Sequence, residues 1–268
     1  MIENIDLSKY KRLFTIGCSF TEYMYPTWAN VLSKSMPNAE FYNLGLSGTN
    51  NPFIANRMAE GNVKFKFCET DLVVVMWTTT ARECHYARGR WINPGNIFSQ
   101  DEYSKEFVEK FADPNGYLIR DLATIELATS YANNLPCTYV GLLSTPIDFR
   151  YLGDYSPSYN DALGNEVLDT YSELLSTFPK SMFELEMNSK WESGSTYRSD
   201  MFEGVREDYH PTCVRYCNYL IKLGFAITED SINYAKASTE KLRGITHRND
   251  FLTDFPECSH LNKIDGIW

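Results

Sequence analysis

The sequence predicts an α/β protein of three layers, in which a mainly parallel sheet lies between two layers of helices. Strand-like and helix-like segments alternate along the 268 residues, and the connections between successive strands are long enough for crossovers. The segment Asp71–Trp77 (DLVVVMW) is a continuous apolar, β-branched run, which is typical of a strand buried on both faces of a parallel sheet. We expect one domain over residues 1–268.

The other elements follow from the spacing of apolar residues and from the positions of Pro and Gly. We expect further strands at 13–17, 41–44 and 137–143, and helices at 27–36, 52–60, 118–135, 167–178, 212–223 and 232–242. Pro37 and Pro136 end two of these helices. The pattern is weak over 86–116 and 145–205. There we expect a long irregular insertion that forms a lid or substrate wall, rich in Tyr151, Tyr155, Tyr159, Trp191 and Tyr197.

Composition excludes several classes of function. The formal net charge of −10 argues against binding to a phosphate backbone, so we expect no nucleic-acid partner. No apolar run reaches the ~18 residues of a membrane span, and the N-terminus lacks the apolar core of a signal peptide. The seven cysteines form no CxxC pair, which favours reduced thiols. We therefore expect a cytoplasmic location, and we expect no metal and no cofactor.

Three polar turns follow the first three predicted strands. They contain Cys18–Ser19, Ser47–Gly48 and Thr78–Thr79. Because ligands of such sheets bind beyond the carboxyl ends of the strands, these turns are the first candidates for a functional site.

The turns, together with residues 207–211 (EDYHP), resemble the sequence blocks of the SGNH (GDSL-like) hydrolase family. Residues 17–21 (GCSFT) are similar to its first block, G-D-S-x-[ST], with Cys18 where Asp is usual. Residues 43–48 (NLGLSG) are similar to the second block. At the place of the third block, G-x-N-D, the chain reads Trp77-Thr78-Thr79-Thr80, so Thr79 stands where the family has Asn.

The resemblance implies an SGNH-type (flavodoxin-like) fold and a serine esterase or carbohydrate O-deacylase. It makes Ser19 the nucleophile and His210 its base, since a serine hydroxyl needs a base to accept its proton. The acid that orients His210 is Asp208, which we favour, or Glu207, which has the family's spacing of three. The resemblance also implies an oxyanion hole formed by Ser19, Gly48 and Thr79.

Arg82 follows the third strand on the same rim. It is a candidate for binding an acyl or sugar carboxylate, and an exposed position on a solvated face is the alternative. The expected substrate is a small-molecule or carbohydrate ester, and the sequence leaves the oligomeric state open.

Each residue also has a structural explanation. Ser19 and Glu22 fit a helix-capping box, as do Thr80 and Glu83, and for the second pair we favour this explanation. The glycines can serve in turns only, and His210-Pro211 can begin a helix. His210, Cys213 and Cys217 share a helix face, but buried cysteine is more often an apolar filler than a metal ligand.

Two other functions remain open. The first is a catalytically weak or silent SGNH-like protein of binding or assembly, which the departures at Cys18 and Thr79 favour. The second is a phosphate-binding α/β enzyme, which the sequence disfavours because the glycine-rich turn 45–48 lacks a P-loop Lys.

Overall fold

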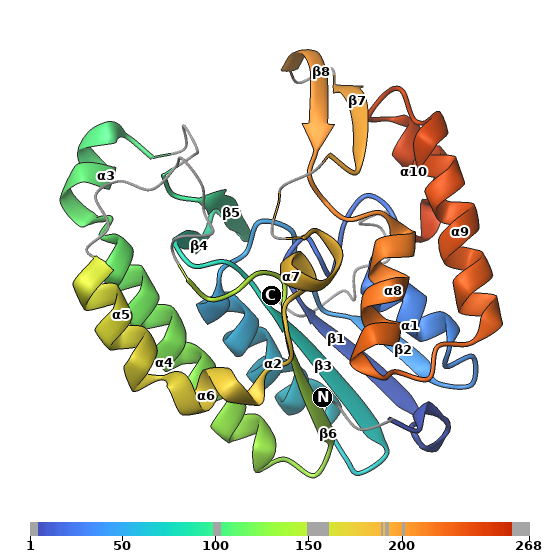
Figure 1. Cartoon of the computed structure of the whole chain (residues 1–268), viewed down its shortest axis with the longest axis horizontal. Helices are drawn as coiled ribbons and strands as arrows, with labels where there is room; N and C mark the ends of the chain where they lie inside the picture. Colours follow the sequence, from blue (N-terminus) through green and yellow to red (C-terminus); the bar gives the residue numbers. More distant parts are fainter. Residues whose placement is uncertain are drawn as a thin grey trace.

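A computed structural model describes residues 5–98, 103–148, 161–188, 190, 193–199 and 202–258. Its centre is a four-stranded sheet in the order β2-β1-β3-β6, in which all pairs are parallel (Figure 1). The strands are β1 (Arg12–Gly17), β2 (Glu40–Asn43), β3 (Asp71–Trp77) and β6 (Thr138–Leu143). Helices cover both faces of the sheet, so the expected three-layer α/β/α fold is confirmed.

The two helical layers lie on opposite sides of the sheet in Figure 1. One layer contains α2 (Asn51–Phe65), α4 (Pro114–Asn133), α5 (Asp161–Thr170) and α6 (Ser172–Thr177). The other contains α1 (Trp28–Lys34), α8 (Cys213–Leu223) and α9 (Glu229–Gly244). The smaller elements are the helices α3 (Lys105–Phe111), α7 (Met182–Glu186) and α10 (Asp250–Asp254) and the 3-10 turns Leu7–Lys9 and Pro256–Cys258.

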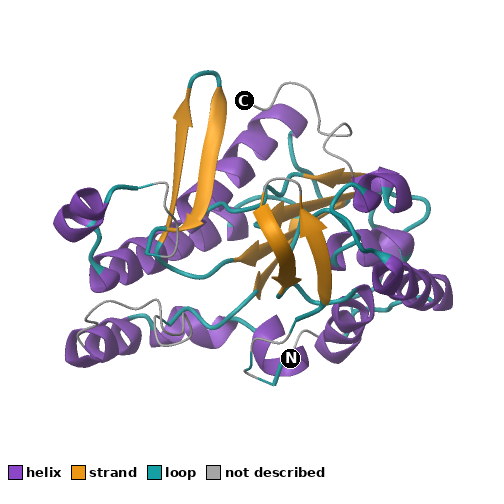
Figure 2. Cartoon of the chain, turned by 90° about the horizontal axis from the view of Figure 1, so that it is seen from above, coloured by secondary structure: helices purple, strands orange, loops and turns teal. Residues whose placement is uncertain are grey.

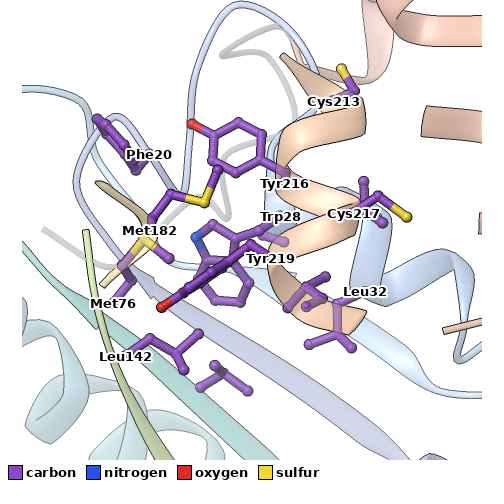
Figure 3. Packing of buried hydrophobic residues seen from close by; sticks show 14 of the residues in the cluster. Phe20, Trp28, Leu32, Met76, Leu142, Met182, Cys213, Tyr216, Cys217 and Tyr219 are labelled. Atoms are coloured by element: carbon purple, nitrogen blue, oxygen red, sulfur yellow. The ribbon is translucent and has the colours of Figure 1, made fainter. Parts of the chain in front are cut away.

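Strand β3 divides its side chains between two apolar cores, and all seven of its residues are buried. Leu72, Val74 and Met76 belong to the core under α1 and α8, whereas the alternate residues Val73, Val75 and Trp77 belong to the core under α2 and α4. This alternation is the period of two of a β-strand. Figure 3 shows the first core, where Trp28 and Tyr219 pack between α8 and the sheet.

Capping side chains explain why α1 and α2 begin close to the predicted positions, whereas the helix expected at 167–178 is two helices, α5 and α6, the first of which begins six residues earlier. The Thr27 side chain accepts a hydrogen bond from the N-terminal backbone of α1, and the Asn30 side-chain oxygen accepts one from the Thr27 backbone N–H, which completes a capping box. Asn50 caps α2 in the same way through the backbone N–H of Phe53. Within the described residues, no helix combines the length and the apolar character that crossing a membrane requires.

Two β-hairpins lie where the sequence predicted irregular chain or a helix start. Strands β4 (Arg82–Ala87) and β5 (Arg90–Asn96) form the first, and β7 (Ser195–Ser199) and β8 (Phe202–Asp208) form the second. Figure 2 shows them as two separate pairs of strands. The helix start expected at Thr80–Glu83 is wrong, because the chain enters β4 there.

Two of the regions expected to be irregular thus contain regular structure. Of the aromatic residues expected to line a lid, only Tyr197 lies within the described residues; Tyr151, Tyr155, Tyr159 and Trp191 lie outside them.

A buried ion pair fixes the amino ends of β1 and β3. Arg12 donates from Nε to Oδ1 of Asp71 at 2.7 Å and from Nη2 to Oδ2 at 2.6 Å. The Asp71 side chain is fully buried, and Oδ2 also accepts from the Cys68 backbone N–H at 2.7 Å. Removal of the arginine would leave a buried carboxylate without its cation.

We expect Arg12→Ala to lower the free energy of unfolding by about 3 kcal/mol, because breaking a buried pair strands a charge. Urea denaturation measures this value. The matched control is Arg243→Ala: Arg243 pairs with Glu240 at 2.6 Å, but both side chains are about two-thirds exposed, so its loss is worth less than about 1 kcal/mol. Equal losses in the two variants would contradict the prediction.

Candidate functional site

The structure brings Asp208 and His210 into direct contact at the end of β8. The Asp208 side chain is almost fully buried, and its Oδ1 lies 2.7 Å from Nδ1 of His210. The same oxygen accepts from the His210 backbone N–H at 3.0 Å. A carboxylate can only accept, so Nδ1 carries the proton and Nε2 of the neutral ring is left as a proton acceptor. Such an arrangement suits a general base.

Glu207 does not share this contact. Its residue is exposed, and its Oε2 accepts a hydrogen bond from the Tyr209 hydroxyl at 2.6 Å. Adjacent residues of a strand point to opposite faces, so Asp208 faces the body of the protein while Glu207 faces solvent.

Aromatic side chains from the turn after β1 surround the His210 ring. Tyr23 stacks on the imidazole with a centroid distance of 3.8 Å and an interplanar angle of 22°. Phe20 lies at 5.4 Å from the ring, and the Tyr25 hydroxyl donates to the His210 carbonyl oxygen at 3.2 Å. His210 therefore packs against the same short segment that contains Ser19.

Ser19 lies in the tight turn that follows β1, and it is 7% exposed. The turn is closed by hydrogen bonds from the backbone N–H groups of Thr21 and Glu22 to the Cys18 carbonyl, at 2.9 and 3.0 Å. Among the described residues, no hydrogen bond joins the Ser19 hydroxyl to His210, and Cys18 is buried in the apolar core. This segment is a turn and not a helix, so Ser19 is not a helix cap.

Gly17 allows the turn to form because a side chain would not fit there. A Cβ at this position would lie 2.8 Å from the Met76 carbonyl oxygen of β3 and would overlap the Thr21 hydroxyl. Steric crowding therefore explains why glycine stands at the first position of the block.

The turns after β1 and β2 are joined by side chains from residues 43–48. Asn43 donates to the Thr21 carbonyl at 3.0 Å and accepts from the Gly45 N–H at 3.1 Å. Ser47 donates to the Glu22 carbonyl at 2.8 Å. These bonds hold the Ser19 turn against the Gly48 turn.

Gly48 adopts a left-handed conformation with φ of +77°, which favours glycine. The β4–β5 hairpin packs directly on this turn, since Asn93 donates to the Ser47 carbonyl and a Cβ on Gly48 would overlap the Asn93 carbonyl oxygen. Within the described residues, neither the Ser19 nor the Gly48 backbone N–H donates a hydrogen bond. Both are free to bind an acceptor.

Thr79 and Arg82 are paired in the loop after β3. Arg82 donates from Nε to the Thr79 hydroxyl oxygen at 2.8 Å. Thr79 is 7% exposed, and its hydroxyl proton is still available for donation because the contact with Arg82 uses only a lone pair. Ala81, between them, is buried with φ of +62°, a strained conformation for a residue other than glycine.

A buried polar network holds this loop in place. Asn51 donates to the Thr78 carbonyl at 3.1 Å and accepts from the Thr78 N–H at 2.9 Å, and it also donates to Asp121 at 3.2 Å. Arg120 bonds to Asp121, to Glu83 at 2.9 Å and to the Arg82 carbonyl at 2.9 Å. Burial raises the pKa of Asp121 to about 6, and Arg120 opposes that shift.

The described residues contain no group of three or more His, Cys, Asp or Glu side chains arranged to hold a metal ion. Cys213 and Cys217 pack in the apolar core, and Cys213 donates to the Pro26 carbonyl. His210 faces Asp208 instead of the cysteines.

Several residues of the site were missed from the sequence. Tyr23, Asn43, Asn51 and Asp121 were not singled out. The aromatic run at 20–25 (FTEYMY) and the asparagine that begins NLGLSG were the available signals. Asp121 gave none, because a single carboxylate within a helix pattern usually lies on a solvated face.

No family model matches the chain, and no curated protein matches it either. Solved structures similar to it include a GDSL-like lipase from Bacteroides thetaiotaomicron (15% identity, 86% of this chain and 88% of that one, TM-score 0.41). A member of the lipolytic G-D-S-L family from Veillonella parvula matches at 16% identity over 79% and 96%, with a TM-score of 0.39. An alpha/beta hydrolase enzyme from the metagenome of Lake Arreo matches at 15% over 88% and 98%, with a TM-score of 0.40. At such values the function of this chain has to be inferred from its own residues.

We expect Gly48→Ala to destabilise the protein by about 2 kcal/mol more than Gly89→Ala. Both glycines have φ of +77°, but a Cβ on Gly89 would have no neighbour within 4 Å. Gly89→Ala should therefore be destabilised only by the strain of the left-handed backbone, about 1–2 kcal/mol. Gly48→Ala should be destabilised further, because the new methyl group displaces Asn93 and its hairpin. Thermal denaturation and proteolysis of the hairpin measure the difference. Equal effects of the two variants would show that the hairpin does not pack on the turn.

We expect the wild-type protein to lose stability, relative to Asp121→Asn, as the pH rises from about 4 to about 6. The Asp121 pKa of about 6 in the folded protein lies above the ~3.9 of an unfolded Asp. In this window the folded protein keeps a proton that the unfolded chain has released, so its stability falls with rising pH, by about 2–3 kcal/mol at most. Urea titrations at several pH values measure it, and parallel profiles for the two proteins would contradict it.

Proposed function

We propose that this protein is a serine hydrolase of SGNH type that cleaves an ester of a small molecule or a carbohydrate. Ser19 attacks the ester carbonyl while Nε2 of His210 takes its proton, and Asp208 stabilises the imidazolium. His210 then gives the proton to the departing alcohol. A water molecule, deprotonated by His210, attacks the acyl-Ser19 ester, and His210 returns that proton to the departing Ser19 oxygen as the acid is released.

The observation that carries the proposal is the 2.7 Å contact between Asp208 and His210 beside the Ser19 turn. This contact leaves Nε2 as the acceptor nitrogen, and it makes Asp208 our candidate for the triad acid in preference to Glu207. The missing Ser19–His210 hydrogen bond is compatible with catalysis, because such bonds are often long until the substrate is bound.

Three groups are candidates for the oxyanion hole. The free backbone N–H groups of Ser19 and Gly48 lie in turns that Asn43 and Ser47 join, and the Thr79 hydroxyl is the third donor. Rigid donors suit this role because they need no reorganisation when charge develops. The remaining N–H groups of Arg82 are candidates for a carboxylate or another oxygen of the substrate, and the two hairpins are candidates for the substrate wall.

The alternative is an SGNH-like binding or assembly protein with little or no turnover. Two observations favour it: the Ser19 hydroxyl has no hydrogen bond to His210, and Arg82 already contacts Thr79. Such a protein would not react with an electrophile that requires an activated serine.

We expect a fluorophosphonate probe to label the wild-type protein at Ser19 only, because His210 activates that hydroxyl. Peptide mapping by mass spectrometry identifies the modified residue. Ser19→Ala should abolish labelling, while Ser176→Ala, which removes an exposed serine of α6 outside the site, should keep Ser19 reactive. Absence of labelling in the folded wild-type protein would support the binding protein instead.

We expect Asp208→Asn to lower kcat on a small acyl ester by about a thousandfold or more, as loss of the acid does in related triads. Glu207→Gln is the matched control and should change kcat by less than about twofold, because Glu207 faces Tyr209. The reverse order of the two effects would make Glu207 the acid.

A further inference from the structure

The proposed base and the proposed nucleophile come from distant parts of the chain. Asp208 and His210 follow the β7–β8 hairpin, whereas Ser19 follows β1. The Arg198 N–H of the hairpin donates to the Thr246 carbonyl, and the Arg248 N–H donates to the Arg198 carbonyl. Neither bond involves the imidazole or the Ser19 turn. We therefore ask which side chain determines where the imidazole lies relative to the serine.

Among the described residues, Tyr23 has the closest ring contact to the imidazole. Its ring stacks on His210 at 3.8 Å and 22°, while Phe20 is tilted by 49° at 5.4 Å. Tyr23 is itself held edge-on by Tyr25 at 5.0 Å, and Tyr25 donates to the His210 carbonyl. Tyr23 also lies only four residues after Ser19, directly after the closed turn 18–22.

We propose that Tyr23 is a positioning residue, which holds the His210 ring in the plane and at the distance that Ser19 requires. The ring supplies a flat surface on which the imidazole can neither tilt nor rotate freely. Because Tyr23 directly follows the hydrogen-bonded turn 18–22 that contains Ser19, one short segment of backbone carries both the nucleophile and the surface on which the base lies. The inference rests on the proposed function only where it is tested by the labelling rate of Ser19, because the NMR test of the His210 position does not require a reactive serine.

The Tyr23 hydroxyl has a second role in the same contact. It interacts with the Asp208 carboxylate and with Tyr197. Burial, together with the negative charge of Asp208, raises the pKa of Tyr23 well above its ordinary value, so the hydroxyl stays neutral and can act as a donor. The Tyr23 ring therefore lies on His210, and its neutral hydroxyl is within the electrostatic influence of the Asp208 carboxylate.

The test compares Tyr23→Leu, which removes the flat ring, with Tyr23→Phe, which keeps it. The first readout is the proton NMR spectrum of the four histidines, with His210 assigned from the His210→Gln spectrum. Protons that lie over an aromatic ring resonate upfield, so the His210 ring protons should be upfield in the wild type and in Tyr23→Phe, and should move downfield in Tyr23→Leu.

The second readout is the rate of fluorophosphonate labelling of Ser19. We expect Tyr23→Leu to slow it at least about tenfold, since displacement of a catalytic group by about 1 Å can cost about a hundredfold, and Tyr23→Phe to restore most of the rate. Tyr42→Leu is the control for loss of a stacked tyrosine elsewhere, because Tyr42 stacks on Phe14 at 4.8 Å and 9°. It should label at the wild-type rate.

The outcomes separate this inference from the proposed function. A wild-type protein that never labels defeats the proposed function, while the NMR shift still decides whether Tyr23 orients His210. Upfield His210 resonances that persist in a folded Tyr23→Leu would overturn the inference. So would a Tyr23→Leu protein that labels as fast as the wild type, or a Tyr23→Phe protein that labels as slowly as Tyr23→Leu.

Discussion

The burial of β3 on both faces is the constraint on which the rest of the structure depends. The backbone N–H and C=O groups of a strand without solvent on either side must form hydrogen bonds with neighbouring strands. Its side chains must pack into two separate apolar cores. Here β1 and β6 supply the hydrogen bonds, and α1 and α8 on one face and α2 and α4 on the other supply the apolar contacts. Parallel neighbours then require crossover helices, and these helices are the two outer layers.

The same constraint assembles the candidate site. In a parallel sheet all carboxyl ends meet at one edge, so the turns after β1, β2 and β3 come together without any direct sequence link. Asn43 joins the first two turns, and Asn51 fixes the third through the Thr78 backbone. The base comes from elsewhere, on the chain that follows the β7–β8 hairpin, and meets the first turn through the rings of Phe20 and Tyr23.

The elements that could be predicted from the sequence are those with strong periodicity. The β3 segment was predicted at its observed bounds, since the six consecutive apolar residues after Asp71, three of them valines, allow little else. The β4–β5 hairpin was missed because Gly89, Pro94 and the polar residues around them hide the period of two. The β7–β8 hairpin was missed because its strands, STYRS and FEGVRED, are mostly polar. The contact between Asp208 and His210 was not determined by spacing either, since carboxylates two or three residues away both reach an imidazole. Only the alternation of β8 separates Asp208 from Glu207, and that strand was not predicted.

The pairing of Arg82 with Thr79 changes how the departure from the family's asparagine should be judged. A lone threonine hydroxyl rotates, and a rotating donor loses much of the benefit of preorganisation. In the proposed site the Arg82 N–H occupies a lone pair of the hydroxyl oxygen, so the proton must point elsewhere. A cationic donor also polarises the hydroxyl and strengthens the hydrogen bond that it gives. In the proposed hydrolase, Arg82, whose carbonyl accepts a hydrogen bond from Arg120, would orient the shorter threonine donor that stands in the place of the amide.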